Sequence, residues 1–211
     1  MSDGIIVIGA RGHAKVVIEI LRDMGERVDY CVGADDSPDV CLGVPVLKGD
    51  GNLKRLHSEG YRRAFVAVGA NQIRQRLADT AERVGFDLVS AVHPRSLVSP
   101  SARLGAGVAV MAGVVINADS SIDDLVIVNT GASVDHDCRI GRAVHIAPHC
   151  ALAGNVTVGA GSFLGVGCKV VPEVRIGQNV TVGAGGVVVS DIADGVTAMG
   201  IPARATAPHG K

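Results

Sequence analysis

The pair His136–Asp137 is the part of the sequence best suited to proton transfer. A neutral imidazole accepts a proton near pH 7, and a neighbouring carboxylate can orient the ring and raise its basicity. The pair lies in the octet of residues 134–141, where His136 comes two residues after the aliphatic Val134. We therefore predict that His136 is a general base and that Asp137 orients it.

A second group of residues could bind phosphate near the start of the chain. The motif Gly-x-x-Gly at residues 9–12 follows an apolar run and precedes an amphipathic segment. Backbone N–H groups at such a strand-to-helix junction can hold a phosphate, although the motif alone also fits an ordinary turn. Asp35 and Asp36 follow the next apolar run, where carboxylates commonly bind a ribose or a base edge. Together these residues predict a nucleotide site.

The first half of the chain must supply the elements that position this site. Apolar runs alternate with amphipathic segments, which indicates a small parallel sheet with helices. The expected strands are residues 5–8, 28–32, 44–47 and 64–68, and the expected helices are residues 14–24 and one capped by Asn71, with apolar positions at Ile73, Leu77, Ala81 and Val84. The fold class predicted for this half is α/β and Rossmann-like.

The second half repeats every six residues. Each sixth residue from Val92 to Val188 is aliphatic, and a period of six indicates short strands stacked as a β-solenoid. Small or β-branched residues four positions later should also point inward, with Cys138, Cys150 and Cys168 as buried filler. The glycines that follow an aliphatic residue are expected to take a positive φ at tight corners, namely Gly105, Gly141, Gly159, Gly165, Gly177 and Gly183. A composition change near Ala91 predicts domains at 1–91 and 92–211.

Composition and charge exclude several classes of function. The net charge is −1, from 20 basic and 21 acidic residues, and without a basic run neither nucleic acid nor an anionic membrane is an expected partner. No apolar stretch approaches the roughly 18 residues of a membrane span, and the start of the chain lacks the charged region of a signal peptide. We therefore expect a cytoplasmic protein. Five cysteines without a C-x-x-C pair indicate neither a disulfide framework nor a zinc site, so no metal is expected.

The repeated pattern of an aliphatic residue followed by glycine is similar to the left-handed parallel β-helix of hexapeptide-repeat acyltransferases. Over nearly its whole length the chain resembles the bacterial sugar acetyltransferases typified by N-acetyltransferases of nucleotide-linked 4-amino-sugars. The resemblance implies an all-β left-handed helix after the Rossmann-like half, and a homotrimer with active sites between subunits. It also implies acetyl-CoA as co-substrate and a UDP- or GDP-linked 4-amino-deoxysugar, a precursor of bacterial glycans or O-antigen, as acceptor.

The resemblance also implies roles for individual residues. Those expected to bind the nucleotide-sugar are Arg11, Gly12, His13, Asp35, Asp36, Gly69 and Asn129, the last at the edge of the active site. For acetyl-CoA, it places His145 near the thioester and the Gly154 backbone N–H on the acetyl oxygen. It places Val166 and Ala184 as backbone contacts of CoA.

Three alternatives remain open from the sequence. An O-acetyltransferase of sialic acid or a related sugar needs the same base, and the repeat does not specify the acceptor. A γ-class carbonic anhydrase would use three histidines to bind zinc, but His136, His145 and His149 are separated by steps of nine and four residues, unlike that family's spacing. A non-catalytic sugar-nucleotide-binding protein would have no need for His136 and Asp137.

Overall fold

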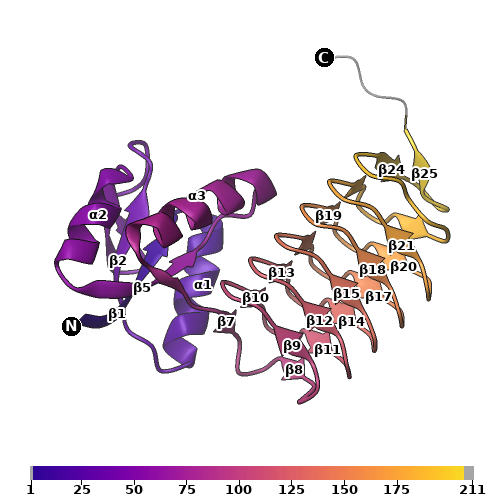
Figure 1. The fold of residues 1–211 in the computed structure, drawn as a ribbon, viewed down its shortest axis with the longest axis horizontal. Coiled ribbons are helices and arrows are strands. Elements are labelled where there is room, and N and C mark those ends of the chain that lie inside the picture. Colours follow the sequence, from indigo (N-terminus) through magenta and orange to yellow (C-terminus); the bar gives the residue numbers. More distant parts are fainter. Residues whose placement is uncertain (1, 207–211) are drawn as a thin grey trace. The chain divides into compact units, whose positions relative to one another are not determined.

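The computed structural model describes residues 2–206 of the 211-residue chain. The chain divides into two compact units, Met1–Pro94 and Arg95–Lys211. The first unit combines helices and strands, whereas the second consists of very short strands that repeat along the chain (Figure 1).

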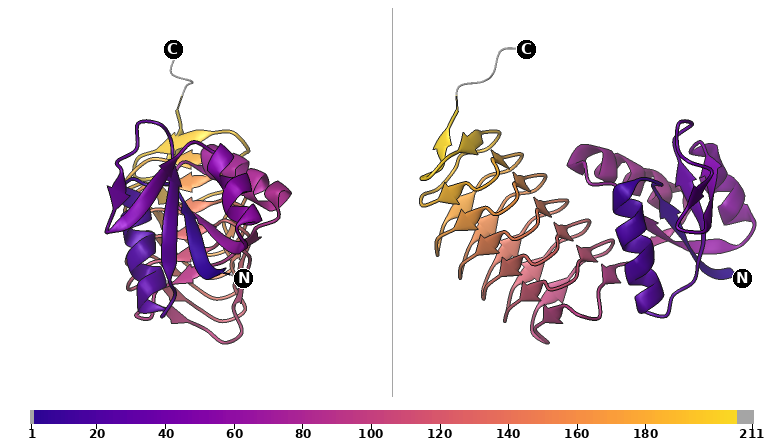
Figure 2. Two further views of the ribbon diagram at one scale, coloured as in Figure 1. Left: turned by 90° about the vertical axis from the view of Figure 1, so that its left-hand side faces the viewer. Right: turned by 180° about the vertical axis from the view of Figure 1, so that it is seen from behind.

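The first unit is built on a sheet of strand order β3-β4-β2-β1-β5-β6. The strands are β1 (Ser2–Ile8), β2 (Val28–Gly33), β3 (Val40–Cys41), β4 (Val44–Lys48), β5 (Tyr61–Val66) and β6 (Asp87–Leu88), and β7 (Ala91–Val92) follows them. The helices are α1 (Gly12–Asp23), α2 (Gly51–Ser58) and α3 (Asn71–Val84). Helix α1 lies on one face of the sheet, and α2 and α3 pack together on the other (Figure 2). The central strand β1 pairs in parallel with β2 and β5, and its apolar run is buried because helices cover both faces.

Two details of the first unit differ from the prediction. Helix α2 and strands β3 and β6 were not predicted. Helix α2 buries only Leu53 and Leu56 and is too short to show a helical period, and each of the two strands has only two residues. Asn71 does not cap α3, since Ala70 occupies the N-cap and Asn71 is the first helical residue. The Asn71 side chain instead accepts a hydrogen bond from Arg74, which removes it from a capping role.

The second unit is a parallel β-helix whose strands pair with partners 18 residues away, as Ile127 with His145 and His145 with Phe163. The first face comprises β10 (Ala109–Val110), β13 (Ile127–Val128), β16 (His145–Ile146), β19 (Phe163–Leu164), β22 (Thr181–Val182) and β24 (Thr197–Met199), with antiparallel β25 (Arg204–Ala205). The second face comprises β8 (Leu97–Val98), β11 (Val115–Ile116), β14 (Ser133–Val134), β17 (Ala151–Leu152), β20 (Lys169–Val170) and β23 (Val187–Val188). The third face comprises β9 (Arg103–Leu104), β12 (Ser121–Ile122), β15 (Arg139–Ile140), β18 (Thr157–Val158) and β21 (Arg175–Ile176). We call the turns from the first to the second face the first corner, and those from the second to the third face the second corner.

The interior of the β-helix follows the six-residue pattern. Every sixth aliphatic residue from Val110 to Val188 is buried, as are Cys138, Cys150 and Cys168 in the other inward position. Two serines share that second position and are buried with their hydroxyls hydrogen-bonded. Ser162, for example, donates to the Gly177 carbonyl at 2.8 Å and accepts from the Val180 N–H at 2.9 Å. These bonds offset the cost of burying a hydroxyl in an aliphatic core.

The expected role of the corner glycines was wrong. Those that directly follow an aliphatic residue, such as Gly159, do not have a positive φ. A Cβ on Gly159 would lie 2.5 Å from the backbone carbon of Gly177, so glycine is needed there because successive coils approach closely. The left-handed conformation occurs two residues later, for example at Gly161 (φ 72°) and at Asp137 (φ 58°).

Candidate functional site

His136 and Asp137 form an exposed pair at the second corner, between β14 and β15. His136 Nδ1 lies 2.8 Å from Asp137 Oδ2, and the left-handed backbone at Asp137 directs its carboxylate back toward the ring. Aspartate adopts this conformation more readily than most residues. The hydrogen bond to Asp137 raises the pKa of His136, and the charges of Asp135 and Asp137 raise it further. The ring is thereby oriented and made more basic, as a general base requires.

Asp135 fixes the backbone that carries the histidine. Its Oδ1 accepts hydrogen bonds from the His136 N–H at 2.8 Å and from Asn117 Nδ2 at 2.9 Å. The bond from Asn117 and then the bond from His136 lower the pKa of Asp135. Sequence reasoning assigned no role to either residue, although the spacing of 18 residues between Asn117 and Asp135 places them on adjacent coils at one corner.

Gly154 lies beside the His136 ring on the following coil. A Cβ at Gly154 would lie 2.6 Å from His136 Cε1 and 2.6 Å from Nε2, so a side chain there would displace the imidazole. Within residues 2–206 the Gly154 N–H donates no hydrogen bond, whereas the next amide, that of Asn155, donates to the His136 carbonyl at 2.9 Å. The structure thus places a free backbone donor next to the exposed ring.

The His136 pair opens onto a polar hollow of about 460 Å³ on the third face. Its lining residues are Arg103, Asp119, Ser121, His136, Asp137, Arg139, Asn155 and Glu173. Both arginines project from strands that pair with Ser121. The hollow therefore places the imidazole among charges of both signs, with two guanidinium groups and the carboxylates of Asp119, Asp137 and Glu173.

The other residues predicted for the β-helix lie on the first face or at the first corner. Asn129 Nδ2 and His145 Nε2 are 3.1 Å apart, and the Phe163 ring contacts His145 edge-on with centroids 5.3 Å apart. Val166, 52% exposed, and Ala184 occupy successive coils at the first corner. The structure therefore groups His136, Asp137 and Gly154 at one corner, apart from this second set.

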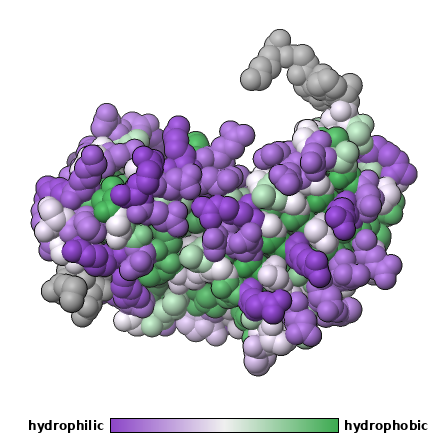
Figure 3. Space-filling view, in the orientation of Figure 1, coloured by the Kyte–Doolittle hydropathy of each residue, from purple (hydrophilic) through white to green (hydrophobic). Residues whose placement is uncertain are grey.

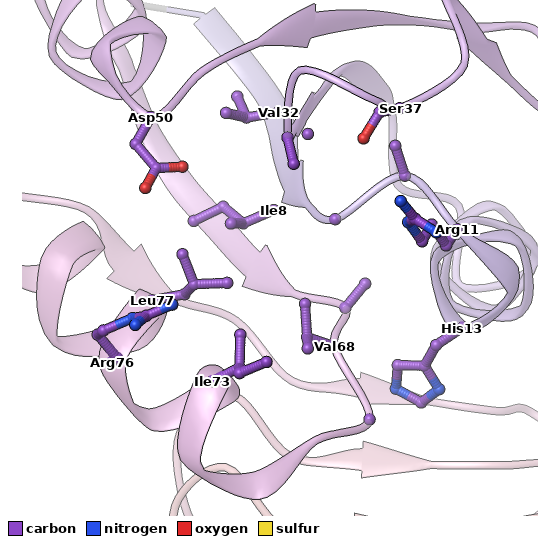
Figure 4. A pocket seen from close by; sticks show the side chains of 16 residues that line it. Ile8, Arg11, His13, Val32, Ser37, Asp50, Val68, Ile73, Arg76 and Leu77 are labelled. Carbon is purple, nitrogen blue, oxygen red and sulfur yellow. The ribbon is translucent and has the colours of Figure 1, made fainter.

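The first unit contains a pocket of about 440 Å³ at the carboxyl ends of β1, β2 and β5 (Figure 4). Three residues predicted to bind the nucleotide line it, namely Arg11, His13 and Gly69. Gly12, Asp35 and Asp36 do not line it, but Asp36 forms an ion pair with Arg11 that lowers the pKa of its carboxyl.

Arg74 was missed by the sequence analysis and holds one wall of this pocket. It is 1% exposed and donates hydrogen bonds to the carbonyls of Val68 at 3.0 Å and Gly69 at 2.9 Å, as well as to Asn71. Burial lowers the pKa of the guanidinium to about 10. The apolar period of α3 predicted that Ile73 and Leu77 face the core. In the structure these two residues line the pocket, and Arg74 faces the core instead.

None of the helices within residues 2–206 has both the length and the apolar character of a membrane-spanning segment. The same residues contain no group of three or more histidine, cysteine, aspartate or glutamate side chains placed to hold a metal ion.

The chain resembles known proteins in both units. Residues 4–81 match the PglD N-terminal domain. GDP-perosamine N-acetyltransferase of Escherichia coli O157:H7 is 31% identical over 170 residues, which cover 78% of this chain and 76% of that protein. UDP-N-acetylbacillosamine N-acetyltransferase of Bacillus subtilis (strain 168) is 37% identical over 120 residues, which cover 51% of each protein.

Solved structures extend the similarity to nearly the whole chain. An asparagine-for-histidine variant of perosamine N-acetyltransferase from Caulobacter crescentus, in complex with CoA and GDP-perosamine, is 56% identical, with a TM-score of 0.95 and coverage of 97% of both chains. The acetyltransferase domain of PglB from Neisseria gonorrhoeae FA1090 is 41% identical, with a TM-score of 0.91 and coverage of 97% of this chain and 100% of that one. These similarities confirm the predicted fold, a Rossmann-like α/β unit followed by a left-handed parallel β-helix. The chain belongs to the family of bacterial sugar N-acetyltransferases.

Proposed function

We propose that the protein transfers the acetyl group of acetyl-CoA to the amino group of a nucleotide-linked 4-amino-deoxysugar, with GDP-perosamine as the first candidate acceptor. The identity of 56% to perosamine N-acetyltransferase supports that choice. The observation that carries the proposal is the hydrogen-bonded pair His136–Asp137 beside the free N–H of Gly154. Such a reaction serves the synthesis of glycan or O-antigen precursors, and its substrates fit a cytoplasmic location.

The pair can perform each proton transfer of the reaction. The sugar amine attacks the thioester carbonyl carbon, and His136 Nε2 takes the proton from nitrogen while Nδ1–H donates to Asp137. The Gly154 N–H donates to the oxygen that becomes negative in the tetrahedral intermediate. When the C–S bond breaks, the imidazolium returns the proton to the sulfur of CoA. The products are the N-acetylated sugar and free CoA.

The pocket of the first unit is the proposed nucleotide site. It begins where β1 meets the N-terminus of α1, at which backbone N–H groups and the helix dipole favour a phosphate. Arg11 and His13 line the same end, and Gly69 presents backbone without a side chain. A diphosphate held there would leave the sugar as the mobile end of the substrate. Asp36 holds the Arg11 side chain by an ion pair, whereas Gly12 and Asp35 do not line the pocket.

A homotrimer with active sites between subunits accounts for the division of the remaining residues. His136 is at the second corner, whereas His145 is on the first face and Asn129, Val166 and Ala184 are at the first corner. Residues on two sides of one β-helix can act on the same thioester when one chain supplies His136 and its neighbour supplies the other set. Apolar surface between the polar side chains of the β-helix is suited to such an interface (Figure 3).

The proposal is tested with a panel of GDP- and UDP-linked amino-sugars, acetyl-CoA and a thiol reagent that detects released CoA. We expect turnover with the amino-sugar nucleotides and none with free sialic acid, which tests the O-acetyltransferase alternative. His136→Ala should lower kcat by about 100-fold or more. His57→Ala is the control, because His57 packs on Phe86 and lines neither pocket, so this change should leave kcat unchanged. A folded His136→Ala protein within about threefold of the parent rate would exclude this mechanism.

A further inference from the structure

The pocket of the first unit has two polar ends separated by apolar walls (Figure 4). Arg11 and His13 lie at one end, and Asp50 and Arg76 lie at the other. The residues between them are apolar and include Ile8, Val32, Val68, Ile73 and Leu77. With a diphosphate at the first end, the apolar middle and the second polar end are left for the ribose and base.

Asp50 lies at the N-terminus of α2, where an aspartate side chain usually caps the helix. It is the N-cap residue of α2, and such a side chain normally accepts a hydrogen bond from an N–H of the first turn. Here its backbone is helical, with φ −64° and ψ −18°, and the side chain makes no capping bond. Within the described part of the chain its carboxylate makes no other hydrogen bond or ion pair, and it lines the pocket instead. Both oxygens are thus available to a ligand.

The walls next to Asp50 suit a flat ring. Ile73 is 43% exposed and lies with Leu77 on the pocket side of α3, although the helix buries its other side against the sheet. Exposed apolar side chains that line a pocket of about 440 Å³ are typical of a ligand site. A base between these walls would direct one edge toward the polar end.

We propose that Asp50 makes the pocket selective for guanine by accepting hydrogen bonds from the base. This inference rests on the proposed function, since it concerns the nucleotide that carries the sugar. Guanine presents two adjacent donors, N1–H and the 2-amino group, which match the two oxygens of a carboxylate. Uracil presents a single N–H between two carbonyl oxygens, and a carboxylate repels those oxygens. Arg76 supplies a donor at the same end of the pocket for the guanine carbonyl.

Binding of unmodified nucleotides tests this selectivity without acetyl transfer. Titration calorimetry would measure the Kd of GDP, inosine diphosphate and UDP for the parent, Asp50→Asn and Asp50→Ala proteins. Inosine diphosphate is the sharpest probe, because it lacks only the 2-amino group of guanine. We expect the parent to bind GDP at least about 10-fold more tightly than inosine diphosphate, and UDP more weakly still. Both variants should bind GDP about 10- to 100-fold more weakly and lose most of the preference for GDP over inosine diphosphate.

The controls separate selectivity from folding and from catalysis. Asp87→Asn removes an exposed carboxylate on β6, outside the pocket, and should leave all three Kd values unchanged. Equal binding of GDP and inosine diphosphate by the parent would overturn the proposal, and so would an equal loss for all three nucleotides in the Asp50 variants. Failure of the parent to bind GDP would overturn it as well. A protein that discriminates these nucleotides yet releases no CoA would contradict the proposed reaction alone.

Discussion

Gly154→Ala should separate the placement of the His136 ring from its chemistry. The new Cβ would lie 2.6 Å from Cε1 and Nε2, so the ring must retreat by about 0.8 Å to reach an ordinary contact of 3.4 Å. A displacement near 1 Å can cost about 100-fold in rate, because reacting atoms lose their attack geometry. We expect kcat to fall about 10- to 100-fold, although the imidazole, Asp137 and the residue-154 N–H all remain.

The same change should leave the β-helix almost as stable as before. Gly154 is outside the left-handed region, so alanine adds no backbone strain, and a Gly→Ala change at a compatible site stabilises by about 0.4–1 kcal/mol. The exposed ring can leave its preferred rotamer at a cost of about 0.5–1.5 kcal/mol. These contributions nearly cancel, and Tm should move by only a few degrees.

The assay is steady-state release of CoA for the parent, Gly154→Ala, His136→Ala and the double variant. If the alanine acts only through the ring, it should have no further effect on kcat once His136 is gone. A kcat of Gly154→Ala equal to that of the parent would refute the clash argument. A further large loss in the His136→Ala background would show that Gly154 acts by another route, such as the position of its own N–H.

Two further predictions concern Asp137 and Arg74. The proposed base is neutral His136, and Asp137 raises the pKa of that ring, so activity should rise with pH through this pKa. Asp137→Asn should shift the rise to lower pH, with a smaller loss of kcat than His136→Ala. An unchanged profile of kcat against pH would show that another group sets the pKa of the ring. Arg74→Lys keeps the charge but cannot reproduce the fork of hydrogen bonds to the Val68 and Gly69 carbonyls, so the free energy of unfolding measured in urea should fall by about 1–3 kcal/mol. Unaltered stability of Arg74→Lys would mean that those carbonyls find other partners.

The β-helix was predictable because one physical rule governs every coil. Residues such as Ile146 must be apolar to fill a narrow interior, so a period of six residues identifies the fold and its inward positions. The corners obey a different rule that the period does not reveal. Close stacking requires glycine at Gly159, whereas positive φ occurs at positions that also accept Asp137.

The sites were less predictable because their residues have ordinary sequence contexts. Ile73 and Leu77 have the spacing of a core-facing helix but line a pocket, and nothing in the sequence distinguishes a pocket wall from a core. Asp50 precedes a short helix that was not predicted, so its side chain could not be placed. His136 stood out in the sequence because an acid–base pair interrupts a repeat of known period, and its role as the base stays a prediction.

Because each coil pairs with residues 18 positions away, equivalent side chains on successive coils are spaced at regular intervals along the axis of the β-helix. Neighbouring coils are one strand spacing apart, about 4.8 Å, so the separation of His136 and Val166 along the axis can change only in steps of that size. Insertion of a whole coil between them would lengthen that separation by one strand spacing and keep each side chain at its own corner. Insertion of six residues would instead carry every later side chain round to the next face. The separation between the His136–Asp137 pair and the first corner can therefore change in fixed steps while both side chains keep their surroundings.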